Sequence, residues 1–273
     1  MLLSQNFIKS PFLIRQLLEA SNINPNDYVL EIGPGRGIIT EQLINKSQKV
    51  LAIEKDPELF EFLTDKFKDK ANLKLINKDF LNFDLPKTDY KIFSNIPFDI
   101  TAEIIDKVLK SDVLPQDLYL IMQQEAAEKY LGERVETQSS VLVKPFYDVQ
   151  ILGDIDRTSF TKKPQVNIVF THFSLKKEFL IDQSFYQNFR DFVIYGFNQW
   201  QPNIQKSFKA VFSFNQFKFI NSHLKVNHLK PSELTFNQWL DFFNIYIKYV
   251  PNNKKDLVDA FEKKYLHRIR PKK

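Results

Sequence analysis

The chain has 273 residues, is 43% hydrophobic and contains no cysteine. This length allows a full hydrophobic core divided between a large and a small domain, whereas the lack of cysteine excludes disulfides, thiolate nucleophiles and cysteine zinc sites. The formal charge of +5 favours an anionic partner, and without a leader-like start or a long apolar segment the sequence predicts a soluble, cytoplasmic protein.

Strand-like segments alternate with helical patterns over the first hundred residues. The predicted strands cover residues 28–32, 50–53, 73–76 and 90–93, and apolar stripes at helical spacing separate the early ones. Parallel strands need a crossover, usually a helix, so this alternation predicts a parallel α/β sheet with helices on both faces. Further strands are predicted over 118–122, 140–149 and 166–173, the last two as an antiparallel edge.

The pattern changes after about residue 175. Residues 176–273 hold 14 of the 27 phenylalanines and both tryptophans. Amphipathic helices are predicted over 185–197 and 239–250, with breaks at Pro202, Pro231 and Pro251. We therefore expect a catalytic domain over residues 1–175 and a small all-α domain over 176–273, with the phenylalanines mainly in its core.

Basic side chains occur near the end of both predicted domains. Lys162 and Lys163 stand beside Pro164, and the last fifteen residues include Lys263, Lys264, Arg268, Arg270, Lys272 and Lys273 against Asp259 and Glu262. Such a tail is either a solvated terminus or an RNA contact. RNA contacts of this kind position the substrate without reading its sequence.

A glycine-rich turn separates the first predicted strand from the first crossover helix. In "YVLEIGPGRGIITEQL", Gly33, Gly35 and Gly37 have GxGxG spacing. Glycines here allow a tight turn and close approach of the backbone to a ligand. The spacing differs from the GxGxxG of dinucleotide binders and from phosphate-cradling loops, so an ordinary βα turn stays an alternative.

Two acids follow the next two predicted strands. Glu54 ends the second strand 21 residues after Gly33, and Asp79 comes shortly after the third. The first acid is placed to bind ribose hydroxyls, and the second can accept from an adenine amino group. Because ligands of open α/β sheets bind at the carboxyl ends of the strands, the three strand ends predict an adenosine site that requires no phosphate.

The fourth strand ends in "SNIPF", residues 94–98. Pro97 lacks a backbone donor and biases Ile96 toward an extended conformation, so the simplest interpretation is a turn that ends the strand. If adenosine lies across the first three strand ends, however, this turn faces the reactive end of the ligand. A second substrate would then enter beside Asn95.

These motifs together resemble those of the rRNA adenine N6-methyltransferases, which use S-adenosylmethionine. "SQNFI" (residues 4–8), "EIGPGRG", Glu54, "KDF" with Asp79, "NIPF" and "FTKKPQVNIVF" (160–170) occur in the family's order. Within the family the chain is more similar to the Erm enzymes, which methylate 23S rRNA and confer resistance to macrolides, lincosamides and streptogramin B. That preference rests on "SQNF", on NIPF where 16S dimethyltransferases usually have NLPY, and on "LTFNQWLDFF" (234–243).

The resemblance implies a Rossmann-like methyltransferase sheet and a role for each motif residue. It implies that the cofactor is bound by Asn6, Ile8, Gly33, Gly35, Glu54 and Asp79, with Asn95 at the reacting centre. For methyl transfer to an exocyclic amine, the Asn95 side chain and the Ile96 carbonyl can accept both amino hydrogens. Pro97 holds this geometry, and Phe98 can stack on a base withdrawn from its neighbours.

This chemistry needs no metal. The four histidines, His172, His223, His228 and His267, lack metal-binding spacing, and we expect surface or helix-packing roles for them. We also expect a monomer that binds ribosomal RNA. Three alternatives stay open: a 16S rRNA dimethyltransferase, a methyltransferase for amides or DNA amines, and a non-catalytic RNA-binding factor.

Overall fold

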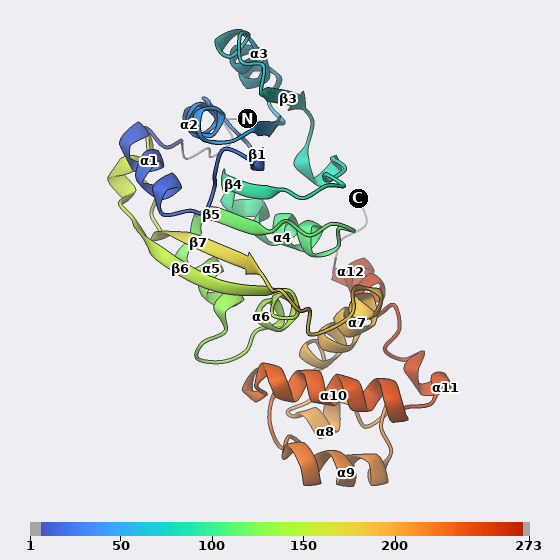
Figure 1. The fold of residues 1–273 in the computed structure, drawn as a ribbon. Coiled ribbons are helices and arrows are strands. Elements are labelled where there is room, and N and C mark those ends of the chain that lie inside the picture. The colour runs from blue at the N-terminus through green and yellow to red at the C-terminus, as the bar shows by residue number, and fades with distance from the viewer. Residues whose placement is uncertain (1–6, 270–273) are drawn as a thin grey trace. The chain divides into compact units, whose positions relative to one another are not determined.

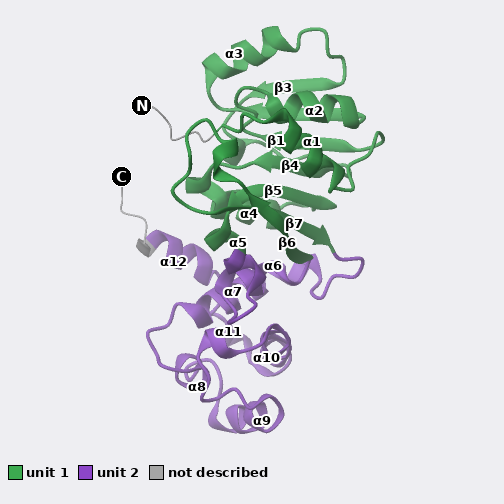
Figure 2. Cartoon of the chain, turned by 90° about the vertical axis from the view of Figure 1, so that its left-hand side faces the viewer, with its two compact units in different colours: residues 1–127, 147–175 green, residues 128–146, 176–273 purple. Residues whose placement is uncertain are grey.

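The computed structural model describes residues 7–269, with side chains as far as His267 (Figure 1). It divides into two compact units, coloured separately in Figure 2. The first contains the chain up to Ala127 together with Tyr147–Leu175, and the second contains Glu128–Phe146 and the chain from Lys176 onward. Within residues 7–269, no helix combines the length and the apolar character needed to cross a membrane.

The first unit is built on one seven-stranded sheet with the order β3-β2-β1-β4-β5-β7-β6. Its first five strands are parallel, and β7 pairs antiparallel with both β5 and β6. The strands are β1 Tyr28–Ile32, β2 Lys49–Glu54, β3 Leu73–Asn77, β4 Lys91–Asn95, β5 Asp117–Gln123, β6 Tyr147–Ile155 and β7 Ile168–Leu175. The predicted parallel sheet with an antiparallel edge is confirmed.

The helices of the first unit begin at the residues that local chemistry favours. Ser10 accepts a hydrogen bond from Leu13 N at 3.2 Å and caps α1 (Pro11–Glu19), and Asp56 caps α3 (Pro57–Lys66) in the same way. Each of these helices has proline in its first turn, where no backbone donor is needed. The other two long helices are α2 (Ile38–Lys46) and α4 (Thr101–Leu109).

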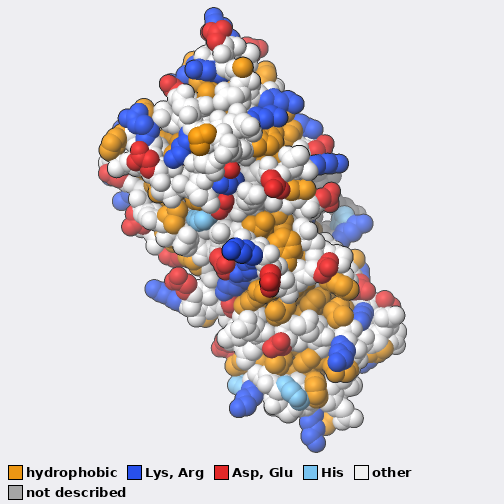
Figure 3. Space-filling model, viewed as in Figure 1, with side chains coloured by type: hydrophobic (Ala, Val, Ile, Leu, Met, Phe, Trp, Pro, Cys, Tyr) orange, Lys and Arg blue, Asp and Glu red, His pale blue; other side chains and the backbone are white. Residues whose placement is uncertain are grey.

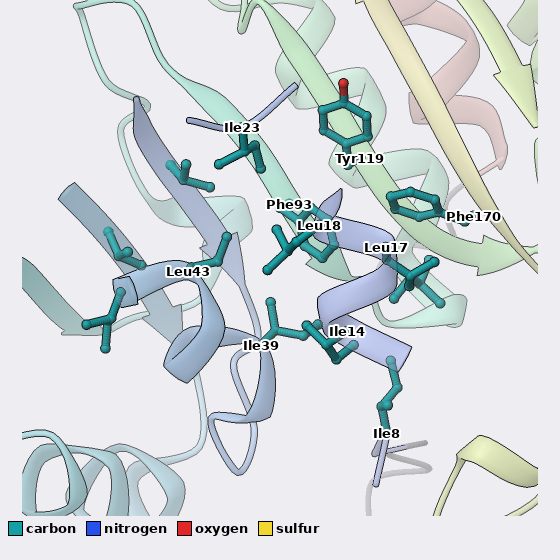
Figure 4. Packing of buried hydrophobic residues seen from close by; sticks show 14 of the residues in the cluster. Ile8, Ile14, Leu17, Leu18, Ile23, Ile39, Leu43, Phe93, Tyr119 and Phe170 are labelled. Atoms are coloured by element: carbon teal, nitrogen blue, oxygen red, sulfur yellow. The ribbon is translucent and has the colours of Figure 1, made fainter. Parts of the chain in front are cut away.

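Helices cover both faces of the sheet. On one face, Ile14 and Leu18 of α1 and Leu43 of α2 pack with Phe93 and Phe170 of the sheet (Figure 4). The helix α4 lies on the opposite face and buries its own apolar stripe (Figure 1). The two layers leave the carboxyl ends of the parallel strands available for a binding site.

The predicted strand over residues 140–149 is wrong for residues 140–146. Residues Gln138–Val143 form helix α6, and β6 begins only at Tyr147. Thr137 and Ser140 explain the difference, since Thr137 Oγ1 accepts from Ser140 N at 3.0 Å while Ser140 Oγ accepts from Thr137 N at 2.8 Å. This capping box starts a helix within an apolar run that is otherwise compatible with a strand.

Helix α6 also belongs to the second unit, although the sequence places it in the catalytic domain. The Tyr186 hydroxyl donates to Leu142 O at 2.9 Å, and Asn198 Nδ2 donates to Gln138 Oε1 at 2.7 Å. The segment Glu128–Phe146 is therefore an insertion between β5 and β6 that belongs to the second unit. It includes the end of α5 (Gln124–Leu131).

The second unit is helical. Its helices after α6 are α7 Tyr186–Phe197, α8 Ile204–Ser207, α9 Phe214–Leu224, α10 Phe236–Tyr249, α11 Asn252–Lys255 and α12 Phe261–Ile269. The buried Phe192 ring contacts the rings of Phe208, Trp239, Phe242 and Tyr246. An aromatic core, as predicted, therefore holds these helices together.

Candidate active site

A cavity of about 200 Å³ lies at the carboxyl ends of the parallel strands. It is lined by residues at or just after the ends of β1, β2, β3 and β4, four neighbours in the sheet. The predicted site residues among them are Gly33, Gly35, Glu54, Asp79, Asn95, Ile96, Pro97 and Phe98. Parallel strand order therefore brings together residues that are up to 65 positions apart in sequence, from Gly33 to Phe98.

The glycine turn after β1 requires glycine at two positions that line the cavity. Gly33 and Gly35 have φ angles of +65° and +58°, in the left-handed region. A Cβ at Gly33 would meet no atom within 4 Å, so the space beside this residue is open to a ligand. A Cβ at Gly35 would lie 2.5 Å from the ring of Phe7, which packs directly over the turn.

The Glu54 carboxylate is buried and held by two backbone amides. Its Oε2 accepts from Gly35 N at 3.0 Å, and its Oε1 accepts from Asp56 N at 2.9 Å. A carboxylate offers about four acceptor positions, so capacity remains for two hydroxyl donors. The geometry fits the predicted role of binding a ribose.

Asp79 lines the same cavity and is held as an ionised acceptor. Its Oδ1 accepts from Leu81 N at 2.9 Å, and its Oδ2 pairs with the exposed Lys55 ammonium at 2.7 Å. The hydrogen bond from Lys55 holds the pKa of Asp79 below its ordinary value. Sequence reasoning missed Lys55, although its place directly after Glu54 put it at the same strand end.

The "NIPF" residues are fixed by the end of β4. Asn95 pairs with Ile121 in the β5 register, and its side-chain oxygen is buried. Ser94 Oγ donates to Ile32 O at 2.5 Å, which joins the end of β4 to the end of β1, directly before the glycine turn. Pro97 (φ −59°, ψ 128°) then directs the chain into a short 3-10 turn at Phe98–Ile100. The turn thus presents Asn95 and Phe98 to the cavity.

The N-terminal segment closes one side of the site. Phe7 lines the main cavity, whereas Ile8 is buried and lines a smaller neighbouring cavity with Gly33 and Asn95. Ile8 forms an antiparallel bridge with Phe160, so this segment is paired with the "FTKKP" loop. Asn6 lies outside the described residues. Phe7 was missed by the sequence reasoning, although it stands between two predicted cofactor residues.

The predicted RNA-binding lysines lie on both units. Lys162 and Lys163 are exposed in the loop after Phe160, and Lys263 and Lys264 are exposed on α12. Lys264 Nζ also donates to Asp259 O at 2.9 Å. The Arg268 side chain and the whole of Arg270 lie outside the described part of the chain. Among the described residues, no group of three or more His, Asp or Glu side chains is arranged to hold a metal ion.

Glu31 is a buried acid next to the site that sequence reasoning left unassigned. It lies on β1 with 1% of its surface exposed, and Thr40 Oγ1 donates to its Oε2 at 2.7 Å. Burial raises the pKa of Glu31 from 4.5 to about 8. Between pH 4.5 and about pH 8, Glu31 therefore stays protonated in the folded protein, whereas the same side chain is ionised in the unfolded chain.

We expect Glu31→Gln to remove a pH dependence of stability. Because the folded pKa is raised, the Glu31 contribution is fully present below pH 4.5 and declines until about pH 8. The decline is at most about 1.4 kcal/mol per pH unit. Urea unfolding measures the free energy of unfolding at pH 5 and at pH 8. Between these two pH values it should fall less for Glu31→Gln than for the wild type. Glu61→Gln, on the exposed side of α3, is the control and should behave as the wild type does. Equal losses in wild type and Glu31→Gln would contradict this account.

Comparisons of sequence agree with these motifs. The family model described as ribosomal RNA adenine dimethylase matches residues 2–248. An rRNA adenine N-6-methyltransferase from Bacillus licheniformis is 30% identical over 254 residues, covering 92% of this chain and 88% of the relative. One from Limosilactobacillus reuteri is 32% identical over 246 residues, with 89% and 95% covered. A ribosomal RNA small subunit methyltransferase A from Malacoplasma penetrans is 29% identical over 255 residues, with 89% and 92% covered.

Two solved structures share the fold over nearly the whole chain. The 23S rRNA methyltransferase ErmE has a TM-score of 0.75 at 24% identity, covering 89% of this chain and 100% of its own. A dimethyladenosine transferase from Plasmodium falciparum also has a TM-score of 0.75, at 23% identity, covering 91% and 98%. The methyltransferase fold, including the helical second unit, is therefore shared with both.

Proposed function

The chain belongs to the ribosomal RNA adenine dimethylase family and is an rRNA adenine N6-methyltransferase, and from that premise we propose that its substrate is an adenine of 23S rRNA and its cofactor S-adenosylmethionine. The observation that carries the site assignment is the single cavity that gathers the glycine turn, Glu54, Asp79 and Asn95. The product would be a 23S rRNA with lower affinity for macrolides, lincosamides and streptogramin B.

The cavity residues fit the proposed cofactor part by part. Gly33 leaves room for the methionine portion, Glu54 has acceptor capacity for the ribose hydroxyls, and Asp79 can accept from the adenine amine. Lys55 leaves Asp79 Oδ2 when that amine binds, at little cost because the lysine is 71% exposed. S-adenosylmethionine, when bound, supplies a methyl group on a sulfonium, which is the reactive bond.

The protein's own task is to orient the target amine. The N6 lone pair of adenine is conjugated with the purine ring, so acceptors on both amino hydrogens help to localise it on nitrogen. Asn95 Oδ1 and the Ile96 carbonyl are the proposed acceptors, with Phe98 stacking on the withdrawn base. The anchoring of Asn95 by β5 and by the Ser94 bond limits its motion, which favours catalysis by positioning.

A second target has its own support. The Malacoplasma penetrans relative is named for the small subunit and is almost as similar as the others, so a 16S rRNA dimethyltransferase is the competing proposal. The choice of 23S rRNA rests on the resemblance of "SQNF", "NIPF" and "LTFNQWLDFF" to the corresponding segments of Erm enzymes. Family membership favours either over an amide or DNA-amine methyltransferase and over a non-catalytic RNA-binding factor.

The target is tested by methyl transfer from labelled S-adenosylmethionine to two substrates, protein-free 23S rRNA and immature 16S particles. We expect label at one adenine of 23S rRNA, mapped by primer extension, and little on the 16S particles. Asn95→Ala is the matched control for adventitious methylation. Label on the small-subunit RNA alone would overturn the 23S proposal in favour of the 16S one.

A further inference from the structure

Helices α9 and α10 of the second unit run antiparallel and border an open groove of about 470 Å³. A side-chain hydrogen bond joins them at each end. Gln216 Nε2 donates to Tyr249 O at 2.7 Å, and Gln238 Nε2 donates to Leu224 O at 3.0 Å. Both glutamines also belong to capping boxes that start the two helices. The walls of the groove are therefore fixed by the fold.

Exposed aromatic rings line this groove, in contrast to the buried rings of the core below it. Phe219 and Tyr249 are 42% and 47% exposed, and their ring centroids lie 5.9 Å apart. The His223 ring lies 4.2 Å from Phe219, and Lys248 Nζ lies 5.2 Å from the Tyr249 centroid. Phe217, two residues before Phe219, is fully packed, so the exposure of Phe219 does not reflect a loosely packed helix.

The part of the chain that forms the groove is basic overall. Between residues 198 and 250 there are six lysines and two acids, a net charge of +4, since 6 minus 2 is 4. All six lysines are exposed, namely Lys206, Lys209, Lys218, Lys225, Lys230 and Lys248. Figure 3 shows basic and histidine side chains beside hydrophobic ones on a face that carries α9 and α10. An anionic partner with flat apolar parts complements such a surface.

We propose that the α9–α10 groove binds an unpaired nucleotide of the RNA substrate. One base stacks on Phe219 or Tyr249, and Lys248, which lines the groove, contacts a phosphate. Asp241 and Asn244, which also line the groove, face the base edge with polar groups. A single-stranded or looped segment fits better than a duplex, because A-form RNA keeps its bases stacked inside the helix. The inference rests on the proposed rRNA methylation and assigns part of substrate recognition to the second unit.

The test uses the full-length protein and two RNA probes of equal length, a single-stranded 12-mer carrying 2-aminopurine and a blunt duplex. Loss of one stacked base weakens binding by roughly 5- to 100-fold. We expect the double variant Phe219→Leu/Tyr249→Leu to bind the single strand more weakly by a factor in this range. It should also no longer quench the fluorescence of 2-aminopurine. Its affinity for the duplex should equal that of the wild type. Phe214→Leu is the matched control, because Phe214 is 79% exposed on α9 but does not line the groove.

Salt dependence separates stacking from phosphate contacts. Removing a ring should leave the slope of log affinity against log salt unchanged, whereas Lys248→Gln should reduce its magnitude by about one. Lys209→Gln, outside the groove, is its control. An unchanged affinity of the double variant for the single strand would overturn the proposal, as would an equal loss for Phe214→Leu. Unchanged RNA affinity with lost methylation of assembled particles would point instead to a protein partner.

A negative result for the groove can be distinguished from a failure of the proposed rRNA methylation. Wild-type protein that methylates no rRNA would reject the function, whatever the groove does. Wild-type protein that methylates protein-free rRNA, together with a double variant of unchanged KM for that RNA, would reject the groove alone. A raised KM with unchanged S-adenosylmethionine affinity is the result expected from the proposal.

Discussion

Replacing Asn95 with alanine is expected to lower kcat for rRNA methylation by roughly 10²- to 10³-fold, the usual effect of removing one positioned hydrogen-bonding group from a reacting centre. Asn95 ends β4 in register with Ile121, and its side-chain oxygen is buried beside the cavity. Alanine retains the strand but offers no acceptor to the target amine. Single-turnover transfer at saturating RNA and S-adenosylmethionine measures this step directly.

The matched variant is Glu54→Ala, which should give the opposite pattern. Glu54 accepts from Gly35 N and Asp56 N and faces the proposed ribose. Its loss should weaken S-adenosylmethionine binding, measured by calorimetry, while kcat at saturating cofactor changes less. Asn95→Ala should change that affinity by only a few-fold. If Asn95→Ala lost cofactor affinity with normal turnover at saturation, the assigned roles would be wrong.

The sequence was sufficient to predict the sheet and the cavity because both depend on local signals. Each parallel strand is a short apolar run that ends at a glycine or a polar residue, and parallel strands place those ends on one edge. Glu54, Asp79 and Asn95 could therefore be grouped without knowing any distance. The caps at Ser10 and Asp56 also depend on local sequence, since each residue directly precedes a proline that begins a helix.

The sequence did not predict features that depend on the spatial order of the strands. His172 was expected at a surface or against a helix, but it lies on β7 directly opposite Tyr119 of β5, with the two rings stacked at 4.3 Å. Its Nε2 is 2.7 Å from Asp117 Oδ1 in the same buried region. The insertion of β7 between β5 and β6 creates this environment, and no periodicity along the chain specifies that insertion. Phe7 and Lys55 are a different case, because each is adjacent in sequence to a predicted site residue and could have been included with it.

The second unit carries a buried ion pair whose loss we expect to be strongly destabilising. Arg190 on α7 donates from Nη2 to Glu262 Oε1 at 2.5 Å and from Nε to Oε2 at 3.0 Å, and both residues are buried. The neighbouring Asp191 accepts from Glu262 N at 2.8 Å, and burial raises the pKa of Asp191. Arg190→Met leaves the buried Glu262 carboxylate without its guanidinium partner, and breaking such a pair costs about 3 to 5 kcal/mol.

Tryptophan fluorescence isolates this effect, because both tryptophans, Trp200 and Trp239, belong to the second unit. Urea unfolding should show Arg190→Met losing its fluorescence transition at a much lower urea concentration than the wild type. The double variant Arg190→Met/Glu262→Met should recover most of the loss, since it removes the stranded carboxylate and retains apolar packing. An unchanged transition for Arg190→Met would show that the pair is not needed. The ion pair also attaches α12, which carries Lys263, to α7. We therefore expect Arg190→Met to show a smaller slope of log RNA affinity against log salt than the wild type, because a displaced Lys263 no longer contacts a phosphate.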